Sequence, residues 1–417
     1  MTRQRELLTG NGAAAWGARL AAVDYLPVFP ITPQTEIIET IGRWIEQGEM
    51  AATMTTMDSE HSMFTAAGTA ATCGVRVMTA SSSQGLLYGL EMIYAVAGWR
   101  VPLVLVNVSR ALSAPVTLEP DHNDVLACRD SGFLQLHCAT CQEVLDTVLI
   151  AHRLAEDERV RLPVIVNLDG YYLSFTREPV LLPDLATVRQ FLPAPAASPA
   201  MPLKAGNPLS QGVAVLGGSQ YSYFRYESHL ASCQALAVYE ELGRDFGRLF
   251  GRSYQAVEEY LCADAEIVLV MIGSFATKAK AAVDLFRRAG LAVGLVRPRL
   301  LRPFPAAPLA AVLAGKKGVA VVDQNISVGQ GGIIWAELAA ALYNQPQRPA
   351  ILASFIGGLG GRDISLADFT GIVREMERAI ESGVCPAPRL LYSERELAQM
   401  HGLQDLASGG ALKGEGK

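Results

Sequence analysis

The sequence predicts an α/β fold with a mostly parallel sheet, followed by a second, smaller α/β unit. Short Val-rich runs at 70–81, 101–109 and 162–170 stop at small or turn residues, which is typical of buried parallel strands. Helical patterns separate these runs, and a second series of alternating strands and helices begins after residue 260. Such alternation favours parallel sheets that carry helices on both faces.

Between the first strands, we expect helices over 85–97 and 142–157, where apolar residues recur near three- and four-residue spacing. The tract 192–218 is rich in Pro, Ala and Gly without clear periodicity, so we interpret it as a linker or surface excursion. The segment 222–261 is charged and contains few helix breakers, which predicts a helix.

In the second unit we expect strands over 265–274, 292–298 and 318–325, and helices over 277–289 and 306–313. The chain after Leu366 is helical in pattern, and its end from Ala407 onward is expected to be disordered. The expected division is a first domain over 1–235, a helical linker over 236–260, a second domain over 261–378 and a tail over 379–417.

Composition narrows the class of protein. Hydrophobic residues make up 50% of the chain, charged residues 18% and aromatic residues 7%, a balance that favours subunit interfaces over a lone monomer. The net charge of −6 argues against a nucleic acid or an anionic membrane as partner. No apolar run approaches the roughly 20 residues that span a bilayer, and the N-terminal residues lack the apolar core of a signal peptide. We therefore expect a cytoplasmic protein.

The cysteines, an odd number spread along the chain, form no disulfide framework. Only Cys138 and Cys141, preceded by His137, have the spacing of metal ligands. A structural zinc or an iron–sulfur cluster normally needs four ligands, and no second pair with this spacing occurs in the sequence. We predict reduced thiols near a strand end and no metal site, since a metal would need ligands from another chain.

Three motifs stand where a predicted strand ends and a turn begins: VFPITPQT at Val28–Thr35, DSEHS at Asp58–Ser62 and SRALSAP at Ser109–Pro115. In an open α/β sheet, ligands bind at this edge. The motifs place there a hydroxyl (Thr32), a carboxylate (Glu60) and a guanidinium (Arg110). Together these groups suit a small anionic substrate and a cofactor that needs a proton relay.

These motifs, together with TASSSQGL at 79–86, DHND at 121–124 and RDSG at 129–132, resemble the α subunit of pyruvate:ferredoxin oxidoreductases, within the 2-oxoacid:ferredoxin oxidoreductase family. The match runs in order from about Gly10 to Val180, and resumes in the second unit and in FIGGLGGRDI at Phe355–Ile364. The resemblance implies a first domain of the thiamine-diphosphate pyrimidine-binding type and a second like the C-terminal domain of transketolase.

By this resemblance Glu60 is the catalytic carboxyl. Thiamine diphosphate must lose its C2 proton to its own exocyclic amine, and a carboxyl that hydrogen-bonds the far ring nitrogen favours the imino tautomer that accepts it. A carboxyl in a partly desolvated pocket suits this task. From spacing alone a helix cap or a surface carboxylate would explain Glu60 better, and the family context reverses that preference.

The resemblance assigns Arg110 to the substrate's carboxylate, because a guanidinium makes a forked contact that lysine cannot reproduce. Thr32 would be a second hydrogen-bond donor, in a loop stiffened by Pro30 and Pro33. The remaining candidates are pocket-shaping side chains (Phe29, Ile31 and Phe133) and supporting groups (His61, Asp121, His122 and Asn123). For the supporting groups, ordinary loop hydrogen bonding is at least as good an explanation.

The chain lacks Gly-Asp-Gly, the signature with which thiamine enzymes bind magnesium and the diphosphate, and it lacks the cysteines of an eight-iron ferredoxin. The resemblance therefore implies a chain that is inactive alone. Its expected partners are a β subunit that holds Mg²⁺ and the diphosphate, a γ subunit, a ferredoxin-like iron–sulfur subunit and, as a further candidate, an NAD/FAD subunit. The cluster Gly329–Gly332 lacks the P-loop lysine, so tight packing at a helix N-terminus explains it better.

The sequence departs from the family pattern at three positions near the pocket. Phe29 stands where the pyruvate enzymes usually carry Tyr, Phe133 where Trp is frequent and Asn123 where Ser is frequent. Because each change alters a polar contact, the expected substrate is pyruvate or a bulkier, branched or aromatic 2-oxo acid such as phenylglyoxylate.

The expected function is oxidative decarboxylation of this acid, with coenzyme A as co-substrate, to the acyl-CoA and CO₂. Electrons would pass through iron–sulfur clusters in partner subunits to ferredoxin or NAD. The alternative is a non-catalytic scaffold that assembles electron-transfer partners, but the presence of Glu60, Thr32 and Arg110 together favours a catalytic subunit. A self-contained dinucleotide enzyme is disfavoured, since no glycine fingerprint follows an early strand.

Overall fold

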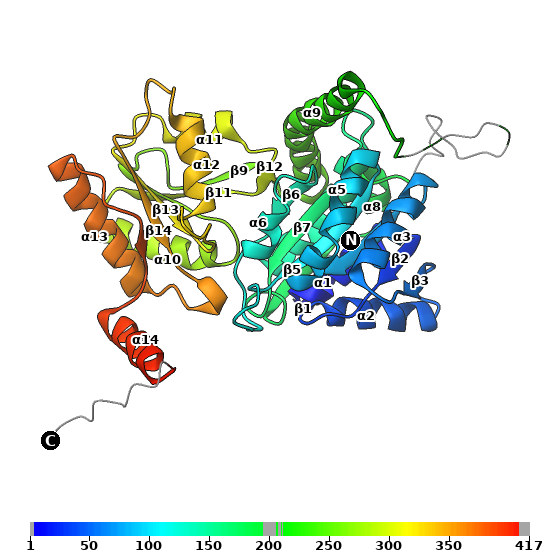
Figure 1. The fold of residues 1–417 in the computed structure, drawn as a ribbon, viewed down its shortest axis with the longest axis horizontal. Coiled ribbons are helices and arrows are strands. Elements are labelled where there is room, and N and C mark those ends of the chain that lie inside the picture. Colours follow the sequence, from blue (N-terminus) through cyan, green and yellow to red (C-terminus); the bar gives the residue numbers. More distant parts are fainter. Residues whose placement is uncertain (1–3, 195–205, 207–209, 211, 408–417) are drawn as a thin grey trace.

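A computed structural model describes residues 4–194, 206, 210 and 212–407. Two α/β units lie side by side, each built around its own sheet (Figure 1). This arrangement confirms the predicted fold class of two successive α/β units with mostly parallel sheets. Most of the tract 192–218 and nearly all of the expected disordered end lie outside the described residues.

The first unit contains a seven-stranded sheet in the order β12-β6-β7-β5-β4-β2-β3, in which only β12 is antiparallel to its neighbour. Its strands are β2 (Tyr25–Val28), β3 (Thr53–Thr56), β4 (Val77–Ser81), β5 (Leu103–Ser109), β6 (Leu134–His137), β7 (Val164–Asp169) and β12 (Leu300–Arg302). A separate antiparallel ribbon is formed by β1 (Gln4–Thr9) and β8 (Arg177–Leu182).

Helices cover both faces of this sheet. The helices of the unit are α1 (Gly10–Leu20), α2 (Thr35–Glu46), α3 (Glu60–Thr72), α4 (Gln84–Tyr88), α5 (Leu90–Trp99), α6 (Asn123–Ala127), α7 (Cys141–Glu156), α8 (Leu185–Phe191) and α9 (Gly218–Phe250). One face packs against α1, α2, α7 and α9, and the other against α3 and α5. The central strands β4, β5 and β7 are buried along their whole length, as expected for parallel strands covered on both sides.

The second unit has a six-stranded sheet in the order β15-β14-β13-β10-β11-β9, parallel except for β9. Its strands are β9 (Val257–Tyr260), β10 (Ile267–Val270), β11 (Val293–Pro298), β13 (Gly318–Asp323), β14 (Ile351–Ile356) and β15 (Arg389–Leu390). Its helices are α10 (Phe275–Arg288), α11 (Ala306–Leu313), α12 (Ile333–Leu342), the short 3₁₀ turn η1 (Leu359–Gly361), α13 (Leu366–Ser382) and α14 (Glu394–Ala407).

The two units are tied together by a shared core and an exchanged strand. One cluster of buried side chains runs from Met63 and Val96 of the first unit to Val268 and Leu338 of the second. Strand β12 follows β11 in sequence, yet it pairs with β6 at the edge of the first sheet. The units therefore share one hydrophobic cluster, in addition to the cluster that each unit forms on the far face of its own sheet.

Several sequence predictions about elements need correction. The helix predicted over 222–261, and with it the helical linker over 236–260, ends at Phe250, because Gly251 adopts the left-handed conformation that terminates helices. Strand β9 follows within the same segment. Helix α9 also packs its buried half against α7 and α8 of the first unit.

Smaller corrections concern three other segments. Residues 70–72 of the strand predicted over 70–81 belong to α3, since this alanine-rich stretch continues the helix. The helix predicted over 85–97 is divided at Gly89 into α4 and α5. After Leu366, the short strand β15 separates two helices.

Within the described residues, no helix has both the length and the apolar character needed to cross a bilayer.

Candidate active site

The three candidate groups lie at the carboxyl-terminal edge of the first sheet. Thr32 follows β2, Glu60 follows β3 and Arg110 follows β5. Because these strands are parallel, their ends meet at one edge. The contact is direct for two of the three motifs, since Nη1 of Arg110 donates a hydrogen bond to the Thr32 carbonyl oxygen at 2.7 Å. The Thr32 residue is exposed, and its hydroxyl has no partner among the described residues.

Glu60 is the first residue of α3 and is only 5% exposed. It does not cap this helix, because Ser59 does so by accepting a hydrogen bond from the Ser62 N–H at 3.2 Å. Burial likewise excludes a surface carboxylate. Among the described residues, the Glu60 carboxyl has no hydrogen-bond or ion-pair partner. A buried polar group without a partner is costly, so this carboxyl is suited to a ligand.

Only glycine at position 85 allows the chain to approach Glu60 so closely. A Cβ atom there would lie 2.6 Å from Oε1 of Glu60 and 2.6 Å from Oγ of Ser81. The Ser81 and Ser82 hydroxyls are buried and have no hydrogen-bond partner within the described structure. The edge beside Glu60 therefore offers several polar groups that the protein itself does not satisfy.

Arg110 is half-buried and held by two acceptors. Besides the Thr32 carbonyl, the Gln84 Oε1 atom accepts a hydrogen bond from Nη2 at 2.7 Å. Nε is buried and has no partner in the described part of the chain. Burial lowers the pKa of Arg110 and the Asp124 carboxylate opposes this, but a guanidinium stays charged in proteins. The remaining N–H groups can bind an anion.

The loop that carries Asp121, His122 and Asn123 faces the second unit. Asp121 accepts a hydrogen bond from the Gly360 N–H at 3.4 Å, and the Asn123 side-chain oxygen accepts one from the Ile326 N–H at 3.0 Å. Burial raises the pKa of Asp121. These contacts are loop hydrogen bonds that hold the two units together.

His122 forms a fully buried pair with Asp169, the last residue of β7. The Nε2–Oδ1 distance is 2.7 Å, and both side chains are 0% exposed. Burial disfavours the charged ring, but the Asp169 carboxylate outweighs this and raises the pKa of His122. Asp169 also accepts hydrogen bonds from the N–H and hydroxyl of Ser274 in the second unit, at 2.7 and 2.6 Å. The pair thus joins the first sheet to the loop after β10.

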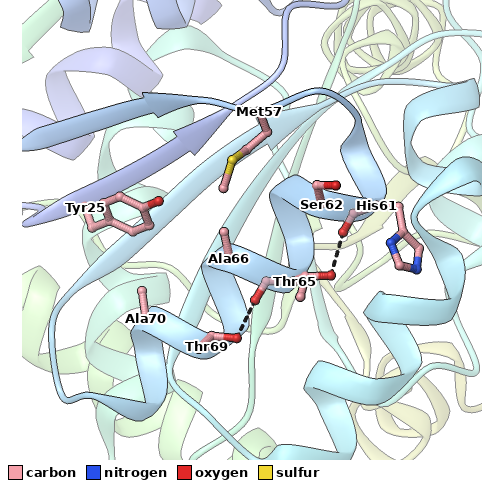
Figure 2. A pocket seen from close by; sticks show the side chains of 8 residues that line it. All are labelled: Tyr25, Met57, His61, Ser62, Thr65, Ala66, Thr69 and Ala70. Carbon is pink, nitrogen blue, oxygen red and sulfur yellow. Dashed lines mark hydrogen bonds between the residues drawn. The ribbon is translucent and has the colours of Figure 1, made fainter.

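The remaining candidates are more scattered. Phe29 is partly buried, and Ile31 is half-buried in the same loop. Phe133 is 1% exposed inside the shared core, so any influence on a pocket would be indirect. His61 lies on the outer side of α3, where Nε2 is 3.2 Å from Oε2 of Glu91. It lines an open cavity of about 710 Å³ with Tyr25, Met57, Ser62, Thr65, Ala66, Thr69 and Ala70 (Figure 2).

The Cys138 and Cys141 side chains are buried, form no disulfide with another described residue and lie close to the end of β6. Burial raises the pKa of Cys138 to about 12 and raises that of Cys141 as well, which makes both unreactive. In the neighbouring buried His137, burial lowers the pKa to about 3. No group of three or more potential metal ligands occurs within the described residues.

The cluster Gly329–Gly332 precedes α12, and its interpretation as helix packing is confirmed. Asp323 at the end of β13 accepts hydrogen bonds from the N–H groups of Ile334 and Trp335 at 2.9 and 3.1 Å. A Cβ atom at Gly332 would lie 1.9 Å from the Asp323 carboxylate. The helix N-terminus is therefore capped by the protein's own carboxylate. Burial raises the pKa of Asp323 to about 6.

Sequence reasoning missed three residues that organise this edge: Gln84, Asp124 and Asp169. Asp124 and Asp169 are both 0% exposed. The available signal was a polar residue inside an apolar strand or directly at its end, as in LVLVNVS and VIVNLD. Such buried polar residues need partners, and here Asn107 and Asn167 provide some of them.

Comparison with known proteins identifies the family. A family model described as pyruvate flavodoxin/ferredoxin oxidoreductase, thiamine diphosphate-binding, matches residues 16–241, more than half of the chain. The chain belongs to this family. A second model, pyruvate:ferredoxin oxidoreductase core domain II, matches residues 265–369. These matches confirm the resemblance seen in the motifs, and the chain is a subunit of a thiamine-diphosphate-dependent 2-oxoacid oxidoreductase.

Curated relatives agree with this family, and the aligned region covers nearly the whole length of each relative. The pyruvate synthase subunit PorA of Methanothermobacter thermautotrophicus is 41% identical over 89% of this chain and 95% of the relative. The ketoisovalerate oxidoreductase subunit VorA of Pyrococcus horikoshii is 39% identical over 91% of this chain and 95% of the relative.

Two solved structures share the fold. The 2-oxoglutarate:ferredoxin oxidoreductase from Magnetococcus marinus has a TM-score of 0.70 at 19% identity, covering 90% of this chain. This chain spans 65% of the length of that neighbour. A split-gene transketolase has a TM-score of 0.50 at 12% identity, covering 89% of this chain and 96% of that chain. At these identities the likeness concerns the fold, and it confirms the predicted transketolase-like architecture.

Proposed function

We propose that this chain supplies the pyrimidine-binding and substrate-binding half of an active site that is completed by a partner subunit. The observation that carries the proposal is Glu60, a buried carboxyl with no partner in the described structure, at the same sheet edge as Thr32 and Arg110. Those groups are also the ones that the family context assigns to cofactor and substrate. The enzyme would convert a 2-oxo acid and coenzyme A to the acyl-CoA and CO₂.

Thiamine diphosphate fits the groups present on this edge. Its pyrimidine ring carries nitrogen atoms that can satisfy the Glu60 carboxyl, and the buried hydroxyls of Ser81 and Ser82 also lack partners in the described chain. When bound, the cofactor supplies a carbon nucleophile for the ketone and accepts the electrons left by loss of CO₂. Glu60 would hold a proton at the pyrimidine ring and so favour the basic form of the cofactor's amine.

Arg110 and Thr32 would bind the substrate. The free N–H groups of Arg110 can hold the carboxylate in a forked contact, and the Thr32 hydroxyl can donate to the same acid. The Arg110 contacts to Thr32 and Gln84 orient the guanidinium before substrate arrives, and such preorganisation lowers the cost of binding.

The missing parts of the reaction are assigned to partners. A β subunit would hold Mg²⁺ and the diphosphate, because this sequence has no Gly-Asp-Gly. A γ subunit and a ferredoxin-like subunit with iron–sulfur clusters would complete a cytoplasmic complex and pass electrons to ferredoxin, or to NAD through an NAD/FAD subunit. Coenzyme A is the co-substrate, in keeping with the coenzyme A bound to the Magnetococcus enzyme.

The substrate would be pyruvate or a bulkier 2-oxo acid. Identity does not separate the two, since the pyruvate relative is 41% identical and the ketoisovalerate relative 39%. Phe29 lies in the loop before Thr32 and would favour a more apolar side chain than tyrosine does. Pyruvate, 2-oxoisovalerate, 2-oxoglutarate and phenylglyoxylate form the test panel.

The test is to copurify the complex from cells and to assay coenzyme A-dependent oxidation of this panel with a reducible dye. We expect acyl-CoA formation from at least one acid and its loss on Arg110→Ala. A non-catalytic scaffold would instead assemble the same partners, and their turnover would be unchanged by Arg110→Ala or Glu60→Gln. That second result would contradict the proposal.

A further inference from the structure

Asp124, the second residue of α6, is a buried carboxylate behind the Arg110 loop. Its side chain is 0% exposed and has no ion-pair partner in the described chain. Burial raises the pKa of Asp124, and the hydrogen bond from Ser109 opposes this rise. A buried carboxylate without a counter-ion is costly unless several donors solvate it, so the donors that surround Asp124 define what it does.

Five donors reach this carboxylate. Oδ2 accepts from the backbone N–H groups of Ser83 and Arg110 at 3.0 and 3.2 Å, and from the Asn107 amide at 3.2 Å. Oδ1 accepts from the Ser109 hydroxyl and the Val125 N–H, both at 2.7 Å. One side chain therefore joins the end of β4, the end of β5 and the start of α6.

Two of these segments carry Gln84 and Arg110, whose side chains are hydrogen-bonded to each other. Gln84 follows Ser83, and its Oε1 accepts the hydrogen bond from Nη2 of Arg110, while its Nε2 donates to the Ser113 hydroxyl at 2.8 Å. Ser83 has φ 49° and ψ −121°, a strained conformation for a residue other than glycine. The hydrogen bond from its N–H to the carboxylate holds the turn in this shape.

We propose that Asp124 is a positioning residue for the 2-oxo acid. By binding the backbone of Ser83 and of Arg110 together, it sets the orientation in which the guanidinium meets the substrate's carboxylate. The inference rests on the proposed function of Arg110. Asp124 is enclosed and does not touch substrate, so its loss weakens substrate binding more than the steps that follow.

The test measures steady-state kinetics of the assembled complex with Asp124→Asn. An amide keeps the shape, but it has one acceptor oxygen instead of two and no charge, so it holds the Ser83 and Arg110 backbones less firmly. We expect KM for the best 2-oxo acid to rise about 10- to 100-fold, with kcat within about threefold. KM for coenzyme A should be unchanged. A fall in kcat at constant KM would overturn the proposal.

Coupling to Arg110 separates positioning from general damage. If Asp124 acts through the guanidinium, the double variant Asp124→Asn/Arg110→Lys has a KM close to that of Arg110→Lys alone, whereas independent effects multiply. The matched control is Asp146→Asn on α7, another carboxylate that is 0% exposed, but one that accepts hydrogen bonds from Arg252 and Tyr254 after α9. This control should lower thermal stability and leave KM unchanged. Multiplicative effects of Asp124 and Arg110, or an equal KM change in the control, would refute the role.

Because Asp124→Asn can fail to fold, Ser109→Ala is measured in parallel, since it removes one of the five donors. We expect a smaller rise in KM, about three- to tenfold. An unchanged KM in this variant would contradict the proposal. A wild-type complex that oxidises no 2-oxo acid would instead refute the proposed function, before any variant is compared.

Discussion

The two parallel sheets share one architecture but use their carboxyl-terminal edges differently. At the edge of the first sheet, Glu60 is only 5% exposed and its carboxyl has no hydrogen-bond partner among the described residues, and Nε of Arg110 is buried without one. At the edge of the second sheet, three successive strand ends bind the first unit. Ser274 after β10 donates to Asp169, the Gln324 carbonyl after β13 accepts from the His122 N–H, and the Gly361 N–H after β14 donates to the Pro120 carbonyl.

The same fold plan therefore does not by itself create an active site. A sheet edge becomes available for chemistry where its polar groups lack protein partners, and it becomes a docking surface where they are paired. Substitutions at the first edge should therefore change catalysis, and substitutions at the contact between the units should change stability.

The largest expected effect is on catalysis at Glu60. In the assembled complex, Glu60→Gln should leave thiamine diphosphate bound but slow exchange of its C2 proton by about 10²–10⁴, the usual effect of losing one positioned acid–base group. Proton exchange followed by NMR after acid quench measures this. Glu91→Gln is the control, because this glutamate of α5 is exposed and its carboxylate contacts His61 of α3. Exchange within a few-fold of wild type in Glu60→Gln would assign the role to another residue.

A large effect on stability is expected at the contact between the units. Arg297 at β11 is 1% exposed and pairs with Glu143 of the first unit and Glu258 of the second. Arg297→Met leaves these carboxylates short of a partner, which should cost about 3 kcal/mol of unfolding free energy without changing KM. Denaturant unfolding checks this, and Arg159→Met at an exposed pair is the control. A raised substrate KM would mean that the contact also shapes the site.

His137 in the first unit and Asp323 in the second should make opposite contributions to local stability in acid. His137 is neutral in the folded first unit, with its pKa lowered to about 3 by burial, whereas the unfolded chain gains this proton near pH 6.5. Burial of neutral His137 therefore lowers the stability of the region around β6 as the pH drops below about 6.5, whereas His122, whose pKa the nearby carboxylates raise, contributes in the opposite direction. Burial raises the pKa of Asp323 to about 6 in the second unit, so the folded form gains its proton first and stability there rises as the pH falls through 6.

Hydrogen exchange resolved by segment at pH 7 and pH 5, corrected for intrinsic rates, measures this contrast. Protection should fall in β6 and β7 and rise at the start of α12. His137→Gln should reduce the fall in the first unit, and Asp323→Asn should remove the rise in the second. If protection from exchange rose in both units, or fell in both, these two groups would not control the local pH response.

The smallest expected effect concerns substrate choice. Phe29→Tyr adds a hydroxyl to the loop before Thr32 and should shift the ratio of kcat/KM between pyruvate and 2-oxoisovalerate by about two- to tenfold toward pyruvate. Phe133→Trp, in the core behind the site, is the comparison and should shift it less. A larger shift from Phe133→Trp would move the control of substrate choice to the core.

Much of this fold could be predicted because its central strands are long, buried and mostly apolar. Leu103–Ser109 and Val164–Asp169 fall inside predicted strands. The short elements could not be predicted in the same way. Strand β12 has three residues and pairs with β6, a partner far away in sequence. No local sequence pattern therefore predicts this strand. The helix predicted past Phe250 failed because charge and helix propensity do not reveal the left-handed Gly251.

The candidate site was predictable to the extent that its residues stand in motifs. Glu60, Thr32 and Arg110 could be proposed as candidates because they lie in recognisable segments at strand ends. Asp124 and Asp169 act through contacts with loops distant in sequence, and a single sequence does not show which loops meet. Buried polar residues inside apolar strands remain the one local sign of such a network.

In the proposed complex, this chain holds only half of the cofactor site. Isothermal titration of thiamine diphosphate with Mg²⁺ into the isolated chain, and into the copurified complex, tests it most directly. We expect no tight, magnesium-dependent binding by the isolated chain and saturable binding by the complex. Micromolar, magnesium-dependent binding by the isolated chain would contradict the split site.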